Sequence, residues 1–157
     1  MIEAVEAIRG VPHLSGVGPR GVAACIDAFL SGLVFGLPLT IALGVRQRET
    51  LTDGTVSYTW SSDGRVFVLW IVITFVYFVV FEAVAGATIG KLLLGLRVRY
   101  EDGSPIGIGA SFARNAFRAI DAFPYFLPYV AGAMSIWNGS KRQRLGDRAA
   151  GTIVVFK

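Results

Sequence analysis

Two carboxylates interrupt the most hydrophobic stretches of this chain, and they are the residues best placed to do chemistry. Asp27 is the only charged residue in the stretch 21–45, and Glu82 is the only one in the stretch 66–86. An ionised acid at the centre of a membrane helix costs about 2.5–3.5 kcal/mol, so acids in such stretches need partners or a function. In transporters, intramembrane acids bind and release a cation or a proton.

Basic partners for these acids come from an amphipathic helix predicted over residues 107–123. Its polar side chains recur at offsets of three and four, with apolar side chains on the other side. By helix rise, Asp27 and Glu82 lie at similar depth, so the basic face of this helix can meet both. We expect one polar cluster just under the cytoplasmic surface, with these members: Arg20, Asp27, Glu82, Arg114, Arg118 and Asp121.

The expected cluster has two interpretations. In the first, surplus carboxylate binds a cation or proton and releases it when the protein changes conformation. In the second, the charges neutralise one another and hold the amphipathic helix against the membrane helices. An open, hydrated cluster favours transport, whereas a dry and fully paired one favours a scaffold.

The elements that carry the acids are two stretches long enough to cross a bilayer. Crossing about 30 Å of hydrocarbon takes about 20 helical residues, and the stretches 21–45 and 66–86 meet that length. Residues 46–65 between them are polar and contain turn signals, which predicts an exposed loop or a short hairpin around VSYTW. Residues 124–138 are apolar but short and contain two prolines, so this third segment either crosses or returns.

Composition excludes most soluble classes. Of 157 residues, 54% are apolar and 17% are charged, which is typical of a protein in lipid. One cysteine and one histidine make an internal disulfide or a zinc site unexpected. The net charge of +4 follows from membrane topology and does not require nucleic acid. We expect no catalytic residues, no metal and no cofactor, and therefore not an enzyme.

Charge distribution predicts the topology. If the third segment returns, twelve Lys and Arg residues lie on one side of the membrane and three on the other. Because Lys and Arg accumulate in cytoplasmic loops, both termini are expected in the cytoplasm of a multi-pass protein of the cell membrane. Four basic residues near the C-terminus are expected to contact anionic lipid headgroups: Lys141, Arg142, Arg144 and Arg148.

Two short β-prone segments bear on the same question. Residues 96–100 and 152–156 are bounded by glycines and have the composition of strands. They can pair with each other as a small cytoplasmic ribbon, which requires both on one side of the membrane. Alternatively, residues 96–100 form a local hairpin across residues 101–105, which places no constraint on the C-terminus.

Several motifs, taken together, resemble the RDD family of small integral membrane proteins. They are PRGVAACID at 19–27, GATIGKLLLGLRV at 86–98, ARNAFR at 113–118 and RQRLGDRAAGT at 142–152. The resemblance implies a membrane domain over residues 19–157, after an N-terminal cytoplasmic segment of residues 1–18. It implies motif roles for Arg20, Asp27, Gly86, Gly90, Lys91, Gly146 and Asp147. The second family aspartate is either Asp147 or Asp121, and the family resembles a transport module.

The sequence therefore predicts an all-α integral membrane protein. It has two full transmembrane helices, an interfacial amphipathic helix and a short third membrane segment that is spanning or re-entrant. We expect a transport-type or ion-coupled module, with a non-catalytic membrane scaffold or assembly protein as the alternative. Because two spans and a short segment cannot enclose a pathway, transport predicts a homo-oligomer. Helix packing through small residues would serve that association; the candidate ridge is Ala24, Ala28, Gly32 and Gly36.

Overall fold

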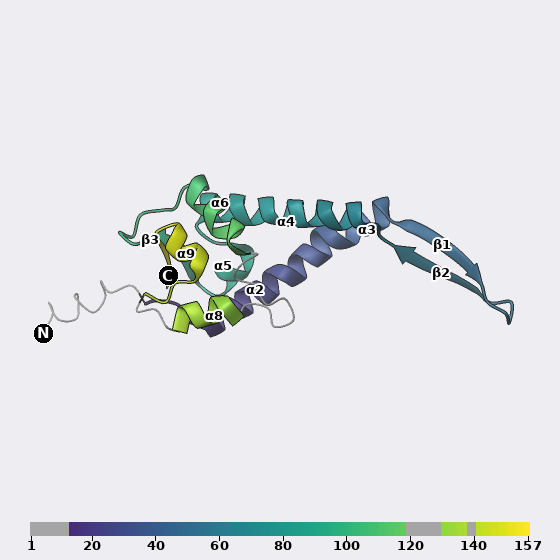
Figure 1. The fold of residues 1–157 in the computed structure, drawn as a ribbon, viewed down its shortest axis with the longest axis horizontal. Helices are drawn as coiled ribbons and strands as arrows, with labels where there is room; N and C mark the ends of the chain where they lie inside the picture. Colours follow the sequence, from purple (N-terminus) through teal and green to yellow (C-terminus); the bar gives the residue numbers. More distant parts are fainter. Residues whose placement is uncertain (1–12, 119–129, 138–140) are drawn as a thin grey trace, which may run out of the picture. The chain divides into compact units, whose positions relative to one another are not determined.

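A computed structural model describes residues 13–118, 130–137 and 141–157 (Figure 1). The chain divides into two compact units. We call Asp27–Tyr77 the hairpin unit, and Met1–Ile26 together with Phe78–Lys157 the network unit. Asp121 and the first part of the expected third segment lie outside the described residues.

The first long helix contains a change in winding. It runs as α2 (Val17–Ser31), a π-helical turn η1 (Gly32–Gly36) and α3 (Leu37–Leu43). Pro38 follows the π turn, and the backbone N–H of Leu37 bonds to the carbonyl of Gly32, five residues earlier. Proline lacks an N–H and its ring crowds the carbonyl four residues back, so wider winding just before it relieves that crowding.

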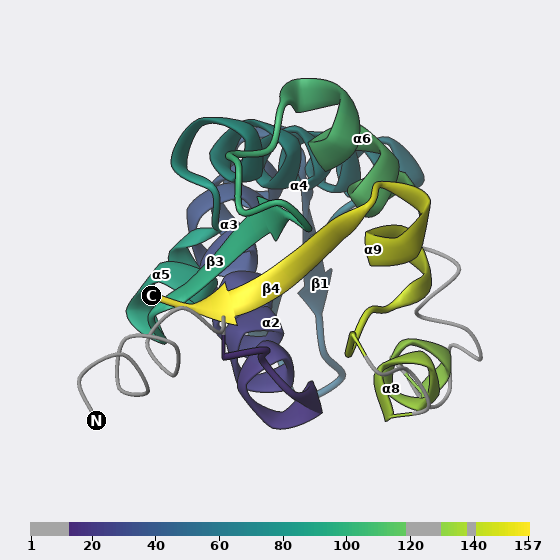
Figure 2. The same ribbon diagram turned by 90° about the vertical axis from the view of Figure 1, so that its left-hand side faces the viewer.

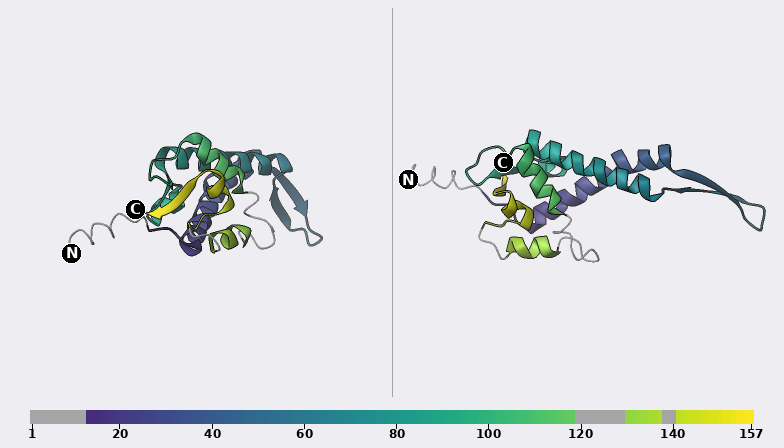
Figure 3. Two further views of the ribbon diagram at one scale, coloured as in Figure 1. Left: turned by 60° about the vertical axis from the view of Figure 1, so that its left-hand side comes forward. Right: turned by 45° about the horizontal axis from the view of Figure 1, so that its top comes forward.

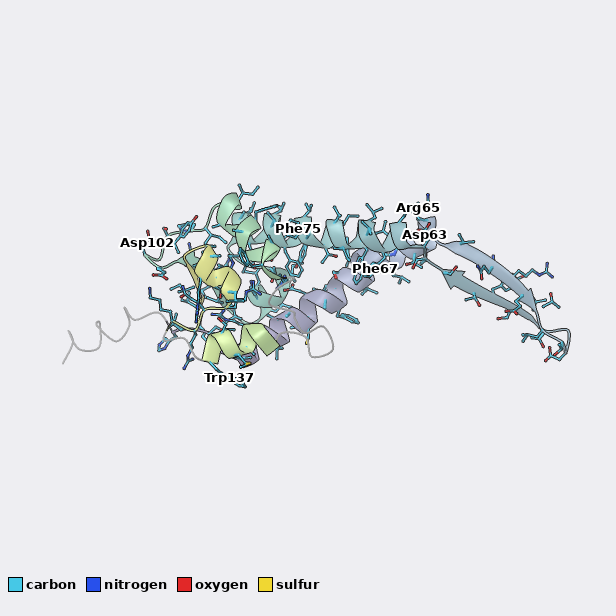
Figure 4. All side chains as sticks on the ribbon, in the orientation of Figure 1. Asp63, Arg65, Phe67, Phe75, Asp102 and Trp137 are labelled. Carbon is cyan, nitrogen blue, oxygen red and sulfur yellow. The ribbon has the colours of Figure 1, made fainter. Side chains whose placement is uncertain are left out.

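Within the part of the chain that the structure describes, two helices are long and apolar enough to cross a membrane. They are Val17–Leu43, of 27 residues, and α4 (Gly64–Ala85), of 22 residues. Large apolar side chains stand exposed on both; Phe29 is 70% exposed and Val84 is 84% exposed. Side chains project from α4 along its length, with Phe67 and Phe75 marking its course (Figure 4). Continuous exposed apolar surface of this kind is unfavourable in water and suits lipid.

Residues between these helices form an extended β-hairpin. Strand β1 (Val45–Thr50) pairs antiparallel with β2 (Val56–Ser61), with Val45 opposite Ser61 (Figure 3). At the tip, the Asp53 carboxylate accepts a hydrogen bond of 2.8 Å from the Thr55 backbone N–H. Of the two forms expected here, the structure has the hairpin, and it is longer than the VSYTW segment alone.

A second ribbon lies in the network unit. Strand β3 (Leu96–Tyr100) pairs antiparallel with β4 (Thr152–Phe156), with Val98 opposite Val154 (Figure 2). The local alternative across residues 101–105 contributes one isolated bridge, between Arg99 and Pro105. The buried apolar core of this unit gathers on the ribbon: Ala23, Leu96, Val98, Ile106 and Val154. The described residues are thus mostly helical, with one antiparallel pair of strands in each unit.

Short helices complete the network unit: α5 (Ile89–Leu93), α6 (Ile108–Ala116), α8 (Val130–Trp137) and α9 (Leu145–Ala149). Helix α6 has the expected amphipathic pattern, and its polar face points inward. Ser111, Arg114 and Asn115 are buried, whereas Ile108 and Phe112 are exposed. Among the described residues, the third segment is represented by the eight residues of α8, about 12 Å of helix, which is shorter than a span.

Candidate functional site

Arg114 on α6 is the centre of a buried group of charges. Its side chain is fully buried and contacts two acids. Its Nε lies 3.2 Å from Glu82 Oε2, and its Nη1 lies 2.8 Å from Asp147 Oδ1. Nη1 also donates to the hydroxyl of Thr152 on β4. A single guanidinium therefore connects α4, α9 and the β3–β4 ribbon.

Glu82 receives its second cation through the turn that ends α4. Gly86 has φ of +66°, a left-handed conformation that glycine adopts without steric cost, and the helix ends before it. The Thr88 side chain then caps α5. This turn returns the chain so that the Lys91 ammonium donates to Glu82 Oε1, while Asn115 Nδ2 donates to Oε2 at 3.2 Å. The GATIGK motif thus ends helix α4 and begins helix α5.

Asp147 both caps α9 and gathers three arginines. Its Oδ2 accepts from the backbone N–H of Arg144 at 3.3 Å, which satisfies a donor at the start of α9. Arg20 Nη1 lies 2.6 Å from Oδ2, and Arg144 Nε lies 3.2 Å from Oδ1. With Arg114, this carboxylate contacts guanidinium groups from the first helix, from α6 and from the C-terminal segment.

Gly146 lets α9 approach α6 closely enough for these contacts. A Cβ atom built at Gly146 would lie 2.6 Å from the backbone oxygen of Arg114. Contacts that short do not occur, so any larger residue has to push the two helices apart. The glycine beside the aspartate in the RLGD motif therefore has a packing role.

We call these six residues the charge network: Arg20, Glu82, Lys91, Arg114, Arg144 and Asp147. Burial acts on both signs of charge within it. Burial raises the pKa of the Asp147 carboxyl, but Arg114, Arg144 and Arg20 outweigh burial and hold the pKa below its ordinary value. Burial lowers the pKa of Lys91 to about 7, with repulsion by Arg114 in the same direction and attraction by Glu82 opposing it.

The network joins only part of the cluster expected from the sequence. Arg20, Glu82 and Arg114 belong to it, whereas Lys91 and Asp147 were expected only as motif residues. Arg118 flanks it: its Nη1 donates to Asn115 Oδ1 at 3.4 Å, and its guanidinium lies 3.9 Å from the centre of the Phe78 ring. Asp121 lies outside the described residues.

Asp27 belongs to the hairpin unit. It is fully buried, and its Oδ1 accepts a hydrogen bond of 3.1 Å from the hydroxyl of Tyr77. The Tyr77 ring in turn packs against Phe35, with ring centres 6.0 Å apart. Because Asp27 and Glu82 lie in different units, their expected convergence stays a prediction.

The basic C-terminal segment needs one correction. Arg144 was expected at lipid headgroups, but its side chain is about 10% exposed and turns inward to Asp147. Its neighbours remain exposed: Lys141 pairs with Glu101, Arg142 donates to the Leu14 carbonyl, and Arg148 donates to the Ser135 carbonyl. A run of Lys and Arg residues is compatible with contacts to lipid headgroups and with buried ion pairs. The sequence alone therefore did not distinguish Arg144 from the others.

The chemistry available to this site follows from its side chains. Guanidinium and ammonium groups hold anions, and the two carboxylates are already engaged by cations. In the described ranges, no group of three or more His, Cys, Asp or Glu residues is arranged to hold a metal ion. The side chains of this site are therefore suited to binding charged groups.

Comparisons with known proteins identify a family from sequence. The family model described as the RDD family matches residues 14–151, which is most of the chain. Neither the curated proteins nor the solved structures include a match. The matched range contains all six residues of the charge network, from Arg20 to Asp147. With two helices able to cross a bilayer and a family match over most of its length, this chain is a membrane protein that belongs to the RDD family.

Proposed function

We propose that this protein is a small transport-type or ion-coupled module of the cell membrane, with the charge network as its ligand-linked site. The observation that carries the proposal is the burial of six ionisable side chains at one place, from both ends of the chain. Burying charges is costly, and a well-packed apolar cluster of similar volume is often more stable. A membrane protein that retains such charges has a use for them beyond holding helices together.

The proposed topology puts both termini on the cytoplasmic side. Twelve of the Lys and Arg residues then lie in the cytoplasm, while Arg46, Arg48 and Arg65 lie outside with the β1–β2 hairpin. Pairing of β3 with β4 supports one side for residues 96–100 and 152–156. A reporter fused after Lys157 tests this: a cytoplasmic signal is expected, and an external signal contradicts the topology.

Transport also requires more than one copy of the chain. Two spans and a short third segment do not enclose a pathway, so the proposal includes a homo-oligomer in a bilayer with anionic headgroups. Exposed Lys141, Arg142 and Arg148 supply the headgroup contacts. Cross-linking in native membranes should give a discrete multimer.

Flux through reconstituted vesicles tests the function. The full chain is placed in vesicles with a pH-sensitive dye inside, and a sodium or proton gradient is imposed. We expect flux that Asp27→Asn and Glu82→Gln each reduce to the level of empty vesicles. Asp63→Asn is the matched control, because Asp63 is an acid that caps α4 outside both the charge network and the hydrophobic stretches 21–45 and 66–86, and Asn caps helices as well as Asp does.

One observation favours a second function, a non-catalytic membrane scaffold. Glu82 accepts from Lys91, Arg114 and Asn115, and Asp147 is engaged by three arginines, so both acids are internally neutralised. Under this alternative, the wild type shows no flux above empty vesicles, and the acid variants change only yield and thermal stability. Each variant is therefore assayed for folding before flux.

A further inference from the structure

The charge network does not balance. Its cations are Arg20, Lys91, Arg114 and Arg144, and its acids are Glu82 and Asp147. Each of these side chains is about 10% exposed or less. The cations therefore exceed the acids by two when Lys91 is protonated and by one when it is neutral, so the surplus is positive in either state. This surplus is opposite in sign to the surplus of carboxylate that cation binding requires.

Hydrogen-bond donors in the network are also in excess. Arginine has five N–H donors, and Arg114 directs Nε to Glu82 and Nη1 to Asp147 and Thr152. Its Nη2 is buried and has no hydrogen-bond partner among the described residues. The same holds for Nε of Arg20. Buried N–H groups nearly always find an acceptor, and a buried N–H group without a hydrogen bond costs free energy of folding.

Arg20 and Arg114 reach the network from different elements and meet at one carboxylate. Arg20 Nη1 contacts Asp147 Oδ2, and Arg114 Nη1 contacts Asp147 Oδ1. The two spare donor groups therefore belong to guanidiniums that contact the two oxygens of one carboxylate, that of Asp147. The Arg20 side chain is about 10% exposed, whereas that of Arg114 is fully buried.

We infer that the charge network holds a phosphate-type oxyanion between Arg20 and Arg114, beside Asp147. This inference names the class of ligand that the charge network binds. It rests on the proposed function only for the role of that ligand in transport. The planar fork of a guanidinium matches the oxygens of phosphate and gives paired, charge-assisted hydrogen bonds. The same phosphate group is present in free inorganic phosphate and in an anionic lipid headgroup, so the experiment treats these as two sources.

The first experiment measures anion binding directly. The full chain in a neutral detergent is unfolded by heat in sodium phosphate and in sodium chloride of equal ionic strength. We expect phosphate to raise the unfolding midpoint beyond chloride, because a ligand bound only by the folded state stabilises it. Arg20→Gln should weaken the apparent phosphate affinity about tenfold or more, the usual order for losing a hydrogen bond to a charged group.

Two further variants sharpen the first experiment. Arg148→Gln is the matched control, since Arg148 lies in α9 beside Asp147 but its side chain is exposed and outside the charge network. It should leave the phosphate effect intact. Arg20→Lys keeps the charge but loses the planar fork, so phosphate should raise its midpoint, relative to its own midpoint in chloride, by less than it raises that of the wild type. Equal losses in Arg20→Gln and Arg148→Gln would mean diffuse charge attraction and would overturn the inference.

Vesicles separate the two sources. The chain is unfolded in vesicles of phosphatidylcholine alone and with phosphatidylglycerol added, each with and without inorganic phosphate. If the ligand is a lipid headgroup, phosphatidylglycerol should stabilise the wild type, and Arg20→Gln should remove this stabilisation. Inorganic phosphate should then add nothing in the vesicles that contain phosphatidylglycerol. A free source predicts stabilisation by inorganic phosphate in both vesicles. If neither phosphatidylglycerol nor inorganic phosphate gives stabilisation that depends on Arg20, the inference is wrong.

An acid of the chain itself is the rival occupant. Glu3, Glu6 and Asp121 lie outside the described residues. If phosphate has no effect on the wild type but stabilises Asp121→Asn, a carboxylate of the chain fills the site and the inference is wrong. The flux assay is read independently: phosphate binding without flux removes the transport proposal alone, and flux without phosphate binding removes this inference alone.

Discussion

The two units of this protein put polar groups to opposite uses. The network unit buries a set of ionised side chains around Arg114, and its apolar α6 face is exposed. The hairpin unit exposes apolar side chains along its helices and uses single polar contacts, such as Trp70 Nε1 donating to the Ser31 carbonyl at 3.1 Å. Lipid cannot satisfy a polar group, so charged side chains on segments that face lipid turn inward, whereas those at a surface that faces water, such as Lys141, need not.

Packing differs between the units in the same way. In the hairpin unit, Gly36 lies against the Trp70 ring, where a Cβ would come within 3.3 Å, beside a cavity also lined by Thr40 and Phe67. Small residues there allow close approach, which drives helix association in lipid. In the network unit, the close approach at Gly146 serves to bring charges together. Stability should therefore depend on ion pairs in the network unit and on close packing in the hairpin unit.

The largest expected effect is at the centre of the network. Arg114→Gln leaves Glu82 and Asp147 buried without their shared cation, and removing one partner of a buried pair costs about 3–5 kcal/mol. We expect a large fall in folded yield and in the unfolding midpoint in detergent. Arg65→Gln, an exposed arginine at the start of α4, is the comparison (Figure 4). Similar losses in both variants would contradict a special role for the network.

Gly146→Ala tests the approach of α9 to α6. Its added Cβ meets the Arg114 backbone, and overpacking of this kind costs about 1–3 kcal/mol. Gly109→Ala is a matched change, because Gly109 is in α6 and nothing lies within 4 Å of a Cβ placed there. Alanine at that helical position should be neutral or stabilising. The two unfolding midpoints should therefore move apart, and equal shifts would exclude the packing explanation.

Lys91 gives the network a pH dependence that the hairpin unit is not expected to share. Its pKa is about 7 when folded and 10.5 ordinarily, so between those values the unfolded chain binds a proton that the folded chain does not. Stability should therefore rise with pH across this window, by at most about 1.4 kcal/mol per pH unit. Below pH 7 both states are protonated and the effect ends. Midpoints of the wild type and Lys91→Gln measured from pH 6 to 10 should diverge, and parallel curves would mean an ordinary pKa.

Tyr77→Phe makes the corresponding test in the hairpin unit. It removes the hydroxyl that donates to Asp27 and keeps the ring that packs on Phe35. Hydrogen bonds between membrane helices contribute about 0.6 kcal/mol on average and about 1.7 at most. We expect a loss of that size in unfolding free energy, smaller than for Arg114→Gln. A loss as large as that of Arg114→Gln would show that Asp27 is as strongly coupled to its surroundings as the network acids are.

Local sequence patterns predicted more of the helices than of the site. Helix length and the three-and-four spacing of polar residues are local, so the two long helices and the inward face of α6 could be anticipated. Arg20 and Asp147 are 127 positions apart, and spacing along the chain does not report such contacts. Pro38 was a sequence signal for the π turn, but a prediction based only on helix length does not use it. Arg144 could not be told from its exposed neighbours, since all four share one basic pattern.

The smallest expected effect comes from an ion pair of the network unit that lies outside the network. Lys141 pairs with Glu101 on the surface, with side chains 57% and 41% exposed, and hydrogen bonds from Lys141 and Gln143 lower the Glu101 pKa. Exposed pairs contribute at most about 1 kcal/mol because water and salt screen them. Lys141→Gln should therefore shift the unfolding midpoint little, and raising the salt concentration should remove the shift. The buried pair of Arg20 with Asp147 should resist the same salt, since screening is weak where water is excluded. A Lys141→Gln effect that survives high salt would mean that burial does not separate the two kinds of ion pair.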